Sequence, residues 1–220
     1  MEEMIHWLHL SDTHYGFTNY ETEKVRDLTL EYIEQQNIRF DFIAITGDIA
    51  YKSQTYSPQT MEFLNMLRNK FLKDRDNLFL VPGNHDLKRS QPRSNMLKGI
   101  LTNKRCMDYI NNEMDEETYH VLLEAFKGTQ EKTGFFDFYR EMTGHLYPEE
   151  DLHFVKERPG FNIIHINTCL FSGMDNEEGK LALLQKKLRY AMKEKEIRGS
   201  DKINIAIPYR SGAYDLYKHF

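Results

Sequence analysis

The first ninety residues alternate short apolar runs with longer stretches of helical periodicity. The apolar runs lie at 7–10, 42–45 and 78–81, and each leads directly into a polar turn. Strands that are apolar throughout, separated by helices, predict a sheet that helices cover on both faces. In the intervening stretches apolar residues recur every three or four positions, first as Val25, Leu28, Tyr32 and Ile33, then as Met61, Leu64, Leu67 and Phe71.

The periodicity changes in the middle of the chain. Residues 91–158 carry apolar positions mostly at helical spacing, so we expect a mainly helical insertion or cap within one domain spanning 1–220. The aromatic segment 135–139 fits either a helix or a strand. Strand signals return at 161–166 and 203–207, and between them an amphipathic helix is predicted from Leu181, Leu184, Leu188 and Met192.

Composition narrows the class of protein. The 220 residues are 40% hydrophobic and 29% charged, which supplies a core and excludes wholesale disorder. A net charge of −5 argues against a surface coated with basic residues for nucleic acid. An acidic N-terminus, two cysteines and no apolar run of bilayer length favour a cytoplasmic protein without membrane contact.

Candidate chemistry lies in the turns that follow the first three strands. These turns are Asp12-Thr13-His14, Gly47-Asp48 and Gly83-Asn84-His85-Asp86. Ligands of open α/β sheets bind outside the carboxyl ends of the strands, so we expect the three turns to meet at one edge. Carboxylate and amide oxygens together with an imidazole nitrogen suit Mn²⁺, Fe or Zn²⁺. A carboxylate on the central strand could bridge two ions.

The three motifs, in this order and after strands, resemble those of the calcineurin-like metallophosphoesterase family. The resemblance covers roughly residues 5–90 and, more loosely, 160–207. It implies an α/β fold, a four-layer α/β/β/α sandwich with the helical insertion, that holds two divalent metal ions, Mn²⁺ first among them. It also implies hydrolysis of phosphomonoesters or phosphodiesters by two-metal activation of water.

The same resemblance implies the metal ligands. Asp12 and His14 would bind the first ion, Asp48 would bridge the two ions, and Asn84 would bind the second.

Catalytic roles follow from the resemblance in the same way. His85 would act as the acid that assists the leaving group or steadies the phosphate in the transition state, oriented by Asp86. Three basic residues, Lys88, Arg89 and Arg93, follow this motif directly and are candidates for holding a substrate phosphate; a plain surface loop is an equal alternative.

The chain departs from the family pattern after residue 203. That pattern continues with a histidine at the end of the next strand and then a Gly-His-x-His motif, but here the strand is followed by Pro208-Tyr209-Arg210. The first metal site therefore lacks one expected ligand and the second lacks two. Three explanations compete. The sandwich could be incomplete at the C-terminus, a partner chain or second copy could complete the site, or the chain could be a degenerate member of the family.

Two functions of different classes remain open on this basis. The first is a metal-dependent phosphoesterase that acts on a phosphodiester, either a nucleotide or a nucleic acid, and in the latter case a nuclease. The alternative is a truncated or degenerate scaffold that binds a partner without catalysis. The absent C-terminal histidines are the feature that separates them.

Overall fold

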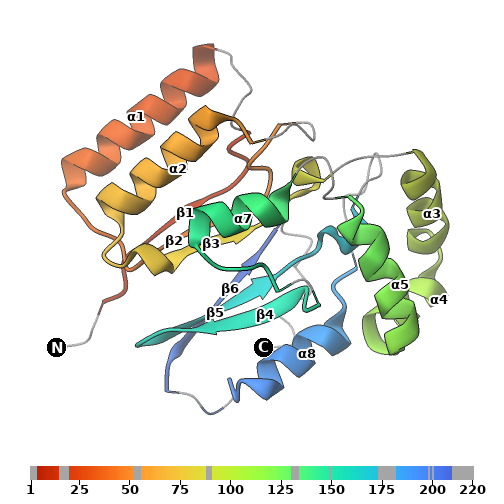
Figure 1. The fold of residues 1–220 in the computed structure, drawn as a ribbon. Coiled ribbons are helices and arrows are strands. Elements are labelled where there is room, and N and C mark those ends of the chain that lie inside the picture. The colour runs from red at the N-terminus through yellow and green to blue at the C-terminus, as the bar shows by residue number, and fades with distance from the viewer. Residues whose placement is uncertain are drawn as a thin grey trace.

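The computed structural model shows a mixed α/β fold with two three-stranded sheets and helices around them (Figure 1). The residues that the structure describes are 4–14, 20–51, 56–87, 91–129, 134–148, 150–172, 182–197, 199 and 201–209.

The first sheet consists of the three strands predicted in the N-terminal part. Strands β1 (Trp7–Leu10), β2 (Phe42–Thr46) and β3 (Leu78–Val81) pair in the order β1-β2-β3, and both pairings are parallel. Every residue of β2 and β3 is buried, as continuous apolar runs predict, whereas β1 is half-exposed. Parallel pairing places the ends of all three strands, and the turns that follow them, at the same edge.

The second sheet contains one strand that the periodicity did not reveal. Strand β4 (His153–Glu157) pairs antiparallel with β5 (Phe161–Ile166), and β5 pairs parallel with β6 (Ile203–Pro208). β4 falls inside the segment 91–158 that was expected to be mainly helical. Its five residues, HFVKE, alternate too briefly to signal a strand, and the backbone of β5 supplies the pairing that makes them one.

Helices cover the outer face of the first sheet. α1 (Tyr20–Gln36) and α2 (Pro58–Phe71) lie side by side there, and α7 (Phe135–Thr143) adds aromatic residues to the same core (Figure 1). Ser57 caps α2 by accepting a hydrogen bond from the Thr60 N–H, and Pro58 occupies the first helical position. The aromatic segment 135–139, for which the sequence fitted either a helix or a strand, is helical.

The predicted buried stripe of α1 is wrong, although the helix itself is confirmed. Val25, Leu28 and Tyr32 are 64%, 53% and 63% exposed, whereas Ile33 is 5% exposed and packs in the core with the partly buried Leu30. Helical spacing shows that residues share a face, but only the position of the sheet decides which face is turned inward.

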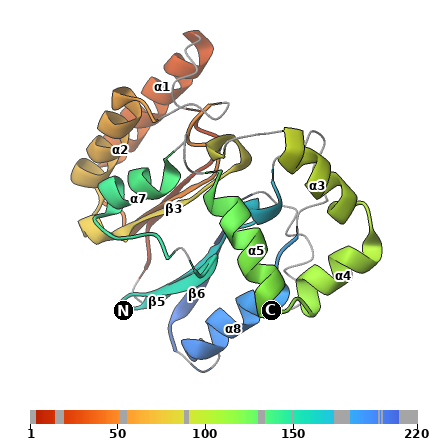
Figure 2. The same ribbon diagram turned by 45° about the vertical axis from the view of Figure 1, so that its right-hand side comes forward.

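The remaining helices lie at the other end of the molecule from α1 and around the second sheet. α3 (Gln91–Leu101), α4 (Lys104–Asn112) and α5 (Glu116–Lys127) are grouped together (Figure 2). α8 (Gln185–Glu194) packs Leu188 against Ile164 and Ile166 of β5. Leu184 of the predicted stripe directly precedes α8, and Leu181 lies outside the described residues.

The two sheets share one hydrophobic core. Phe42 and Phe79 of the first sheet belong to the same buried cluster as Phe161, Ile163 and Ile207 of the second. The rings of Phe42 and Phe161 lie 5.2 Å apart between centroids. The fold is thus mixed α/β. The four-layer α/β/β/α order of the sandwich stays a prediction, as does the assignment of residues 91–158 to an insertion or cap.

No helix in the described parts of the chain combines the length and the apolar character that crossing a membrane requires.

Candidate metal centre

Backbone hydrogen bonds join the three motif turns at the carboxyl edge of the first sheet. The Asp12 N–H donates to the Gly47 carbonyl (3.2 Å), and the His14 N–H donates to the Asp48 carbonyl (2.9 Å). The Gly47 N–H in turn donates to the carbonyl of Val81 (2.8 Å), at the end of β3. Residues 34 or 35 positions apart in sequence are therefore in contact, as the strand–turn pattern predicts.

Three side chains of these turns form a group that could hold one cation. Ligand atoms of Asp12, His14 and Asp48 all lie within 4.8 Å of one another. Asp48 is buried at 1% exposure, and the buried Nδ1 atom of His14 has no hydrogen-bond partner. A buried nitrogen lone pair without a donor is costly unless a proton or a cation meets it, so this donor set fits a single borderline metal ion.

The backbone at this group is held in an unusual conformation. Asp12, His14 and Asp48 have φ angles of 52°, 42° and 51°, in the left-handed region that L-residues rarely occupy. Such conformations cost free energy and persist where the surroundings fix them, and they concentrate at functional sites. Here the inter-turn hydrogen bonds fix them, and all three potential ligands share the feature.

The Asp86 carboxylate braces the turns. It belongs to the short helix η2 (Asn84–Asp86), is completely buried, and burial raises its pKa to about 6. Its oxygens accept hydrogen bonds at 2.8–3.2 Å from the backbone N–H groups of Gly83, Ile49 and Ala50 and from the hydroxyl of Tyr56. Asp86 therefore locks the β3 turn to the β2 turn, and its orienting of His85 stays a prediction.

His85 borders the candidate metal group. Its backbone N–H donates to Asp48 Oδ1 at 2.9 Å, and its ring centroid lies 4.9 Å from that of His14. The ring of Tyr51 lies 5.7 Å from His14 and 6.1 Å from His85. Tyr51 was missed by sequence reasoning; its only signal was its place three residues after Asp48 in the same turn.

Tyr209 is the second residue that sequence reasoning missed. It stands after β6, where the family pattern has histidine, and its side chain is completely buried. Its hydroxyl has one proton, which Asp48 Oδ2 (2.9 Å) and Asn84 Oδ1 (2.6 Å) share as acceptors. The phenol therefore contacts the two oxygens that the family resemblance assigns to a second ion.

Of the three candidate substrate-binding residues, Arg93 is the one that the structure describes. Arg93 lies on α3, is 8% exposed, and donates to the carbonyl oxygens of Ser172 (Nε, 3.0 Å) and Leu170 (Nη2, 2.5 Å). These contacts tie α3 to the turn after β5. Lys88 and Arg89 lie outside the described residues, so phosphate binding by this trio stays a prediction.

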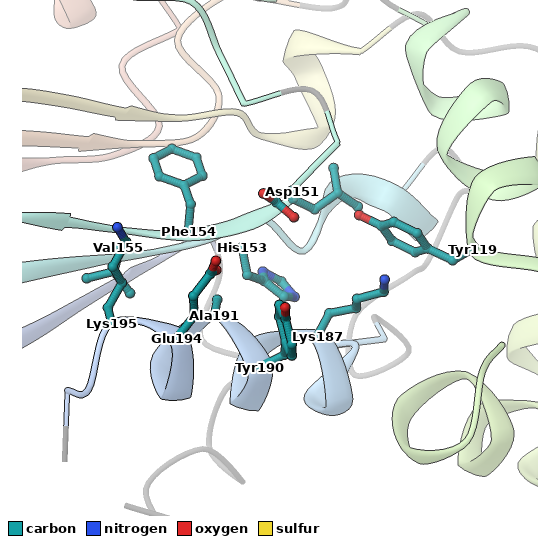
Figure 3. Close-up of a pocket in the computed structure, with 11 residues that line it drawn as sticks. Tyr119, Asp151, His153, Phe154, Val155, Lys187, Tyr190, Ala191, Glu194 and Lys195 are labelled. Carbon is teal, nitrogen blue, oxygen red and sulfur yellow. The ribbon is translucent and has the colours of Figure 1, made fainter. Parts of the chain in front are cut away.

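A cavity of about 140 Å³ is present elsewhere, between β4 and α8 (Figure 3). Its walls include Tyr119, His153, Lys187 and Tyr190, and none of its lining residues comes from the three motif turns. The cavity is therefore separate from the candidate metal centre.

Comparison with known proteins gives the class to which this fold and site belong. Residues 5–190 match the family model for calcineurin-like phosphoesterases, and the chain belongs to that family. Among curated proteins, it is 36% identical over 211 residues to YydB of Bacillus subtilis (strain 168), described as an uncharacterized metallophosphoesterase-like protein. The match covers 94% of this chain and 42% of the relative, so the chain spans less than half of that protein's length.

Proposed function

We propose that this chain is a metal-dependent phosphoesterase domain that hydrolyses a phosphodiester. The observation that carries the proposal is the converged group of Asp12, His14 and Asp48, with an unpartnered His14 nitrogen, in a chain of the calcineurin-like phosphoesterase family. Asp12 and Asp48 supply negative charge, and His14 supplies a nitrogen ligand. This donor set suits Mn²⁺, with Fe or Zn²⁺ as alternatives.

The chain's own residues define what the site would do. A divalent cation held there would supply the Lewis-acid chemistry that activates water and offsets charge on phosphoryl oxygens. Asp12, His14 and Asp48 would fix its position, and Asp86 would keep the turns in register. His85, whose ring lies beside that of His14, would donate a proton or a hydrogen bond to the oxygen that leaves phosphorus.

The test is Mn²⁺-dependent hydrolysis of a chromogenic phosphodiester, with the matching phosphomonoester in parallel. We expect Asp12→Asn to reduce turnover by more than the ~10–100-fold typical of residues that only support a metal ligand. Asp27→Asn is the matched control, because Asp27 has a side chain that is 73% exposed on α1. Full activity in a folded, metal-loaded Asp12→Asn variant would refute the proposal. Faster cleavage of the monoester would reassign the substrate class.

A non-catalytic partner-binding scaffold is the second candidate, and the contact of Tyr209 with Asn84 favours it. This candidate predicts no turnover of either chromogenic substrate with Mn²⁺, Fe²⁺ or Zn²⁺ in a folded protein. Completion of the site by a second copy predicts instead that the rate per chain rises with protein concentration. A rate per chain that stays constant over a wide dilution series would exclude completion by a second copy.

The natural phosphodiester would be a nucleotide or a nucleic acid. Competition of each with the chromogenic substrate distinguishes them: the one that inhibits hydrolysis and is itself cleaved is the substrate class.

A further inference from the structure

We propose that the Tyr209 phenol takes the place of a second cation, so that this centre binds one metal ion where two were expected. The inference rests on the proposed function only in assuming that Asp12, His14 and Asp48 hold an ion. It goes beyond that function by stating how many metal ions the centre binds and by naming Tyr209 as the residue that sets this number.

The phenol oxygen lies between the two side chains that a second ion would need. It is 2.9 Å from Asp48 Oδ2 and 2.6 Å from Asn84 Oδ1, both within hydrogen-bond range. A cation that used the same two oxygens would sit about 2.0–2.3 Å from each of them. The phenol oxygen and such a cation cannot occupy the same space, and the single hydroxyl proton, shared between the two oxygens, competes with a cation for their lone pairs.

The Tyr209 ring is fixed in this position by its surroundings. The side chain has 0% exposure, and its backbone carbonyl accepts a hydrogen bond from Thr168 Oγ1 at 2.9 Å. The ring also packs directly on Gly47: a Cβ atom at that position would lie 1.8 Å from Tyr209 Cδ2. Movement of the phenol away from Asn84 therefore requires displacement of the end of β6 or of the Gly47 turn.

Because of its contact with the Tyr209 hydroxyl, Asp48 can bind a metal ion only on the side that faces Asp12 and His14. Asp48 Oδ1 accepts from the His85 N–H and Oδ2 accepts from Tyr209, so both oxygens are already oriented by donors. The remaining lone pairs can serve the ion shared with Asp12 and His14. Tyr209 thereby acts as a positioning residue for Asp48, replacing by a hydrogen bond the interaction that a second ion would provide.

The test counts metal ions and asks whether they are neighbours. Metal-free protein is dialysed against excess Mn²⁺, bound manganese is measured by elemental analysis, and its electron paramagnetic resonance spectrum is recorded. We expect one ion per chain with the spectrum of an isolated Mn²⁺. We expect Tyr209→His to bind two ions with an exchange-coupled spectrum, because the imidazole is shorter and supplies a ligand. Tyr190→His, at an exposed position of α8, controls for manganese binding by an added histidine and should retain one ion.

The outcomes separate this inference from the function on which it rests. Two coupled ions in the wild type, or one ion in folded Tyr209→His, would overturn the inference and leave the phosphoesterase proposal standing. No bound ion in the folded wild type would overturn both. If Tyr209→His does not fold, the wild-type count alone decides. Loading the wild type with Fe³⁺ gives an independent measurement: a visible tyrosinate-to-iron absorption band would show that the phenol is a ligand, which also refutes the inference.

Discussion

His153 is an uncharged histidine buried beside the cavity between β4 and α8 (Figure 3). Its Nε2 atom donates to the Leu183 carbonyl at 2.6 Å, while its buried Nδ1 atom has no hydrogen-bond partner. Burial lowers its pKa from 6.5 to about 4. The unfolded chain therefore binds a proton on this residue more readily than the folded chain does between these two pH values.

The sign of the pH effect follows from that difference. The stability that His153 contributes is present above pH 6.5 and is lost as the pH falls toward 4, because protonation favours the unfolded state. We expect the change from pH 7 to pH 5 to cost about 2 kcal/mol through this residue. Urea denaturation of wild type and His153→Gln at the two pH values measures it. The variant should lose about 2 kcal/mol less, and His120→Gln, at an exposed position, should lose as much as the wild type.

At the scale of single residues the sequence was most informative where chemistry is encoded in a short motif. Asp12, His14 and Asp48 were named from residue type and from their place after strands, and the structure brings them together. Tyr51 and Tyr209 could not be named in this way, because a tyrosine after a strand is ordinary unless its neighbours in space are known. What the sequence could show was that tyrosine, and not histidine, directly follows Pro208.

Among the elements, helices α1 and α2 use their apolar residues in opposite ways. Leu67 of α2 is fully buried between the helix and the first sheet, whereas Leu28 of α1 is 53% exposed. Both leucines stand at positions where helical spacing predicted burial. The pair offers a matched comparison of one substitution in two environments.

We expect Leu67→Ala to lower the free energy of unfolding by about 2–5 kcal/mol, since it removes buried methyl groups and leaves a cavity. Leu28→Ala should change it by less than about 0.5 kcal/mol, because little apolar surface returns to water. Chemical denaturation of both variants measures the difference. A cost above about 2 kcal/mol for Leu28→Ala would mean that this face of α1 is covered in the folded protein.

The elements also show why periodicity works in one place and fails in another. β2 and β3 are covered on both faces, so their apolar runs stand out in the sequence. β4 is a strand because the next strand along the chain, β5, pairs with it. α1 turns Ile33 inward because the residues that it packs against, those of the first-sheet core, lie on that side of the helix. In both cases contacts with a neighbouring element decided the outcome.

For the molecule as a whole, the contact between the two sheets holds the candidate site in shape. Phe42 of β2 and Phe161 of β5 are 0% and 5% exposed and face each other in the shared core. β6, which carries Tyr209 to the first sheet's edge, belongs to the second sheet. The position of the phenol therefore depends on how the sheets pack.

We expect Phe42→Ala and Phe161→Ala each to cost about 3–5 kcal/mol of stability. The double variant should cost less than the sum of the two by about 0.5–1.5 kcal/mol, the coupling of a buried aromatic pair. A double-mutant cycle by chemical denaturation measures this. Strict additivity would indicate that the two sheets are not coupled through these rings.

The sequence by itself determined the strand–turn pattern, the family and the turns that carry the candidate donor residues, because these depend on residue type and local spacing. Only the tertiary structure decided that β4 joins the second sheet, that α1 exposes its apolar stripe and that Tyr209 reaches Asp48 and Asn84. Tyr209 is separated from Asp48 by 161 positions in the sequence and from Asn84 by 125. Such contacts depend on how two sheets pack through a common core, and no local pattern in the chain encodes that geometry.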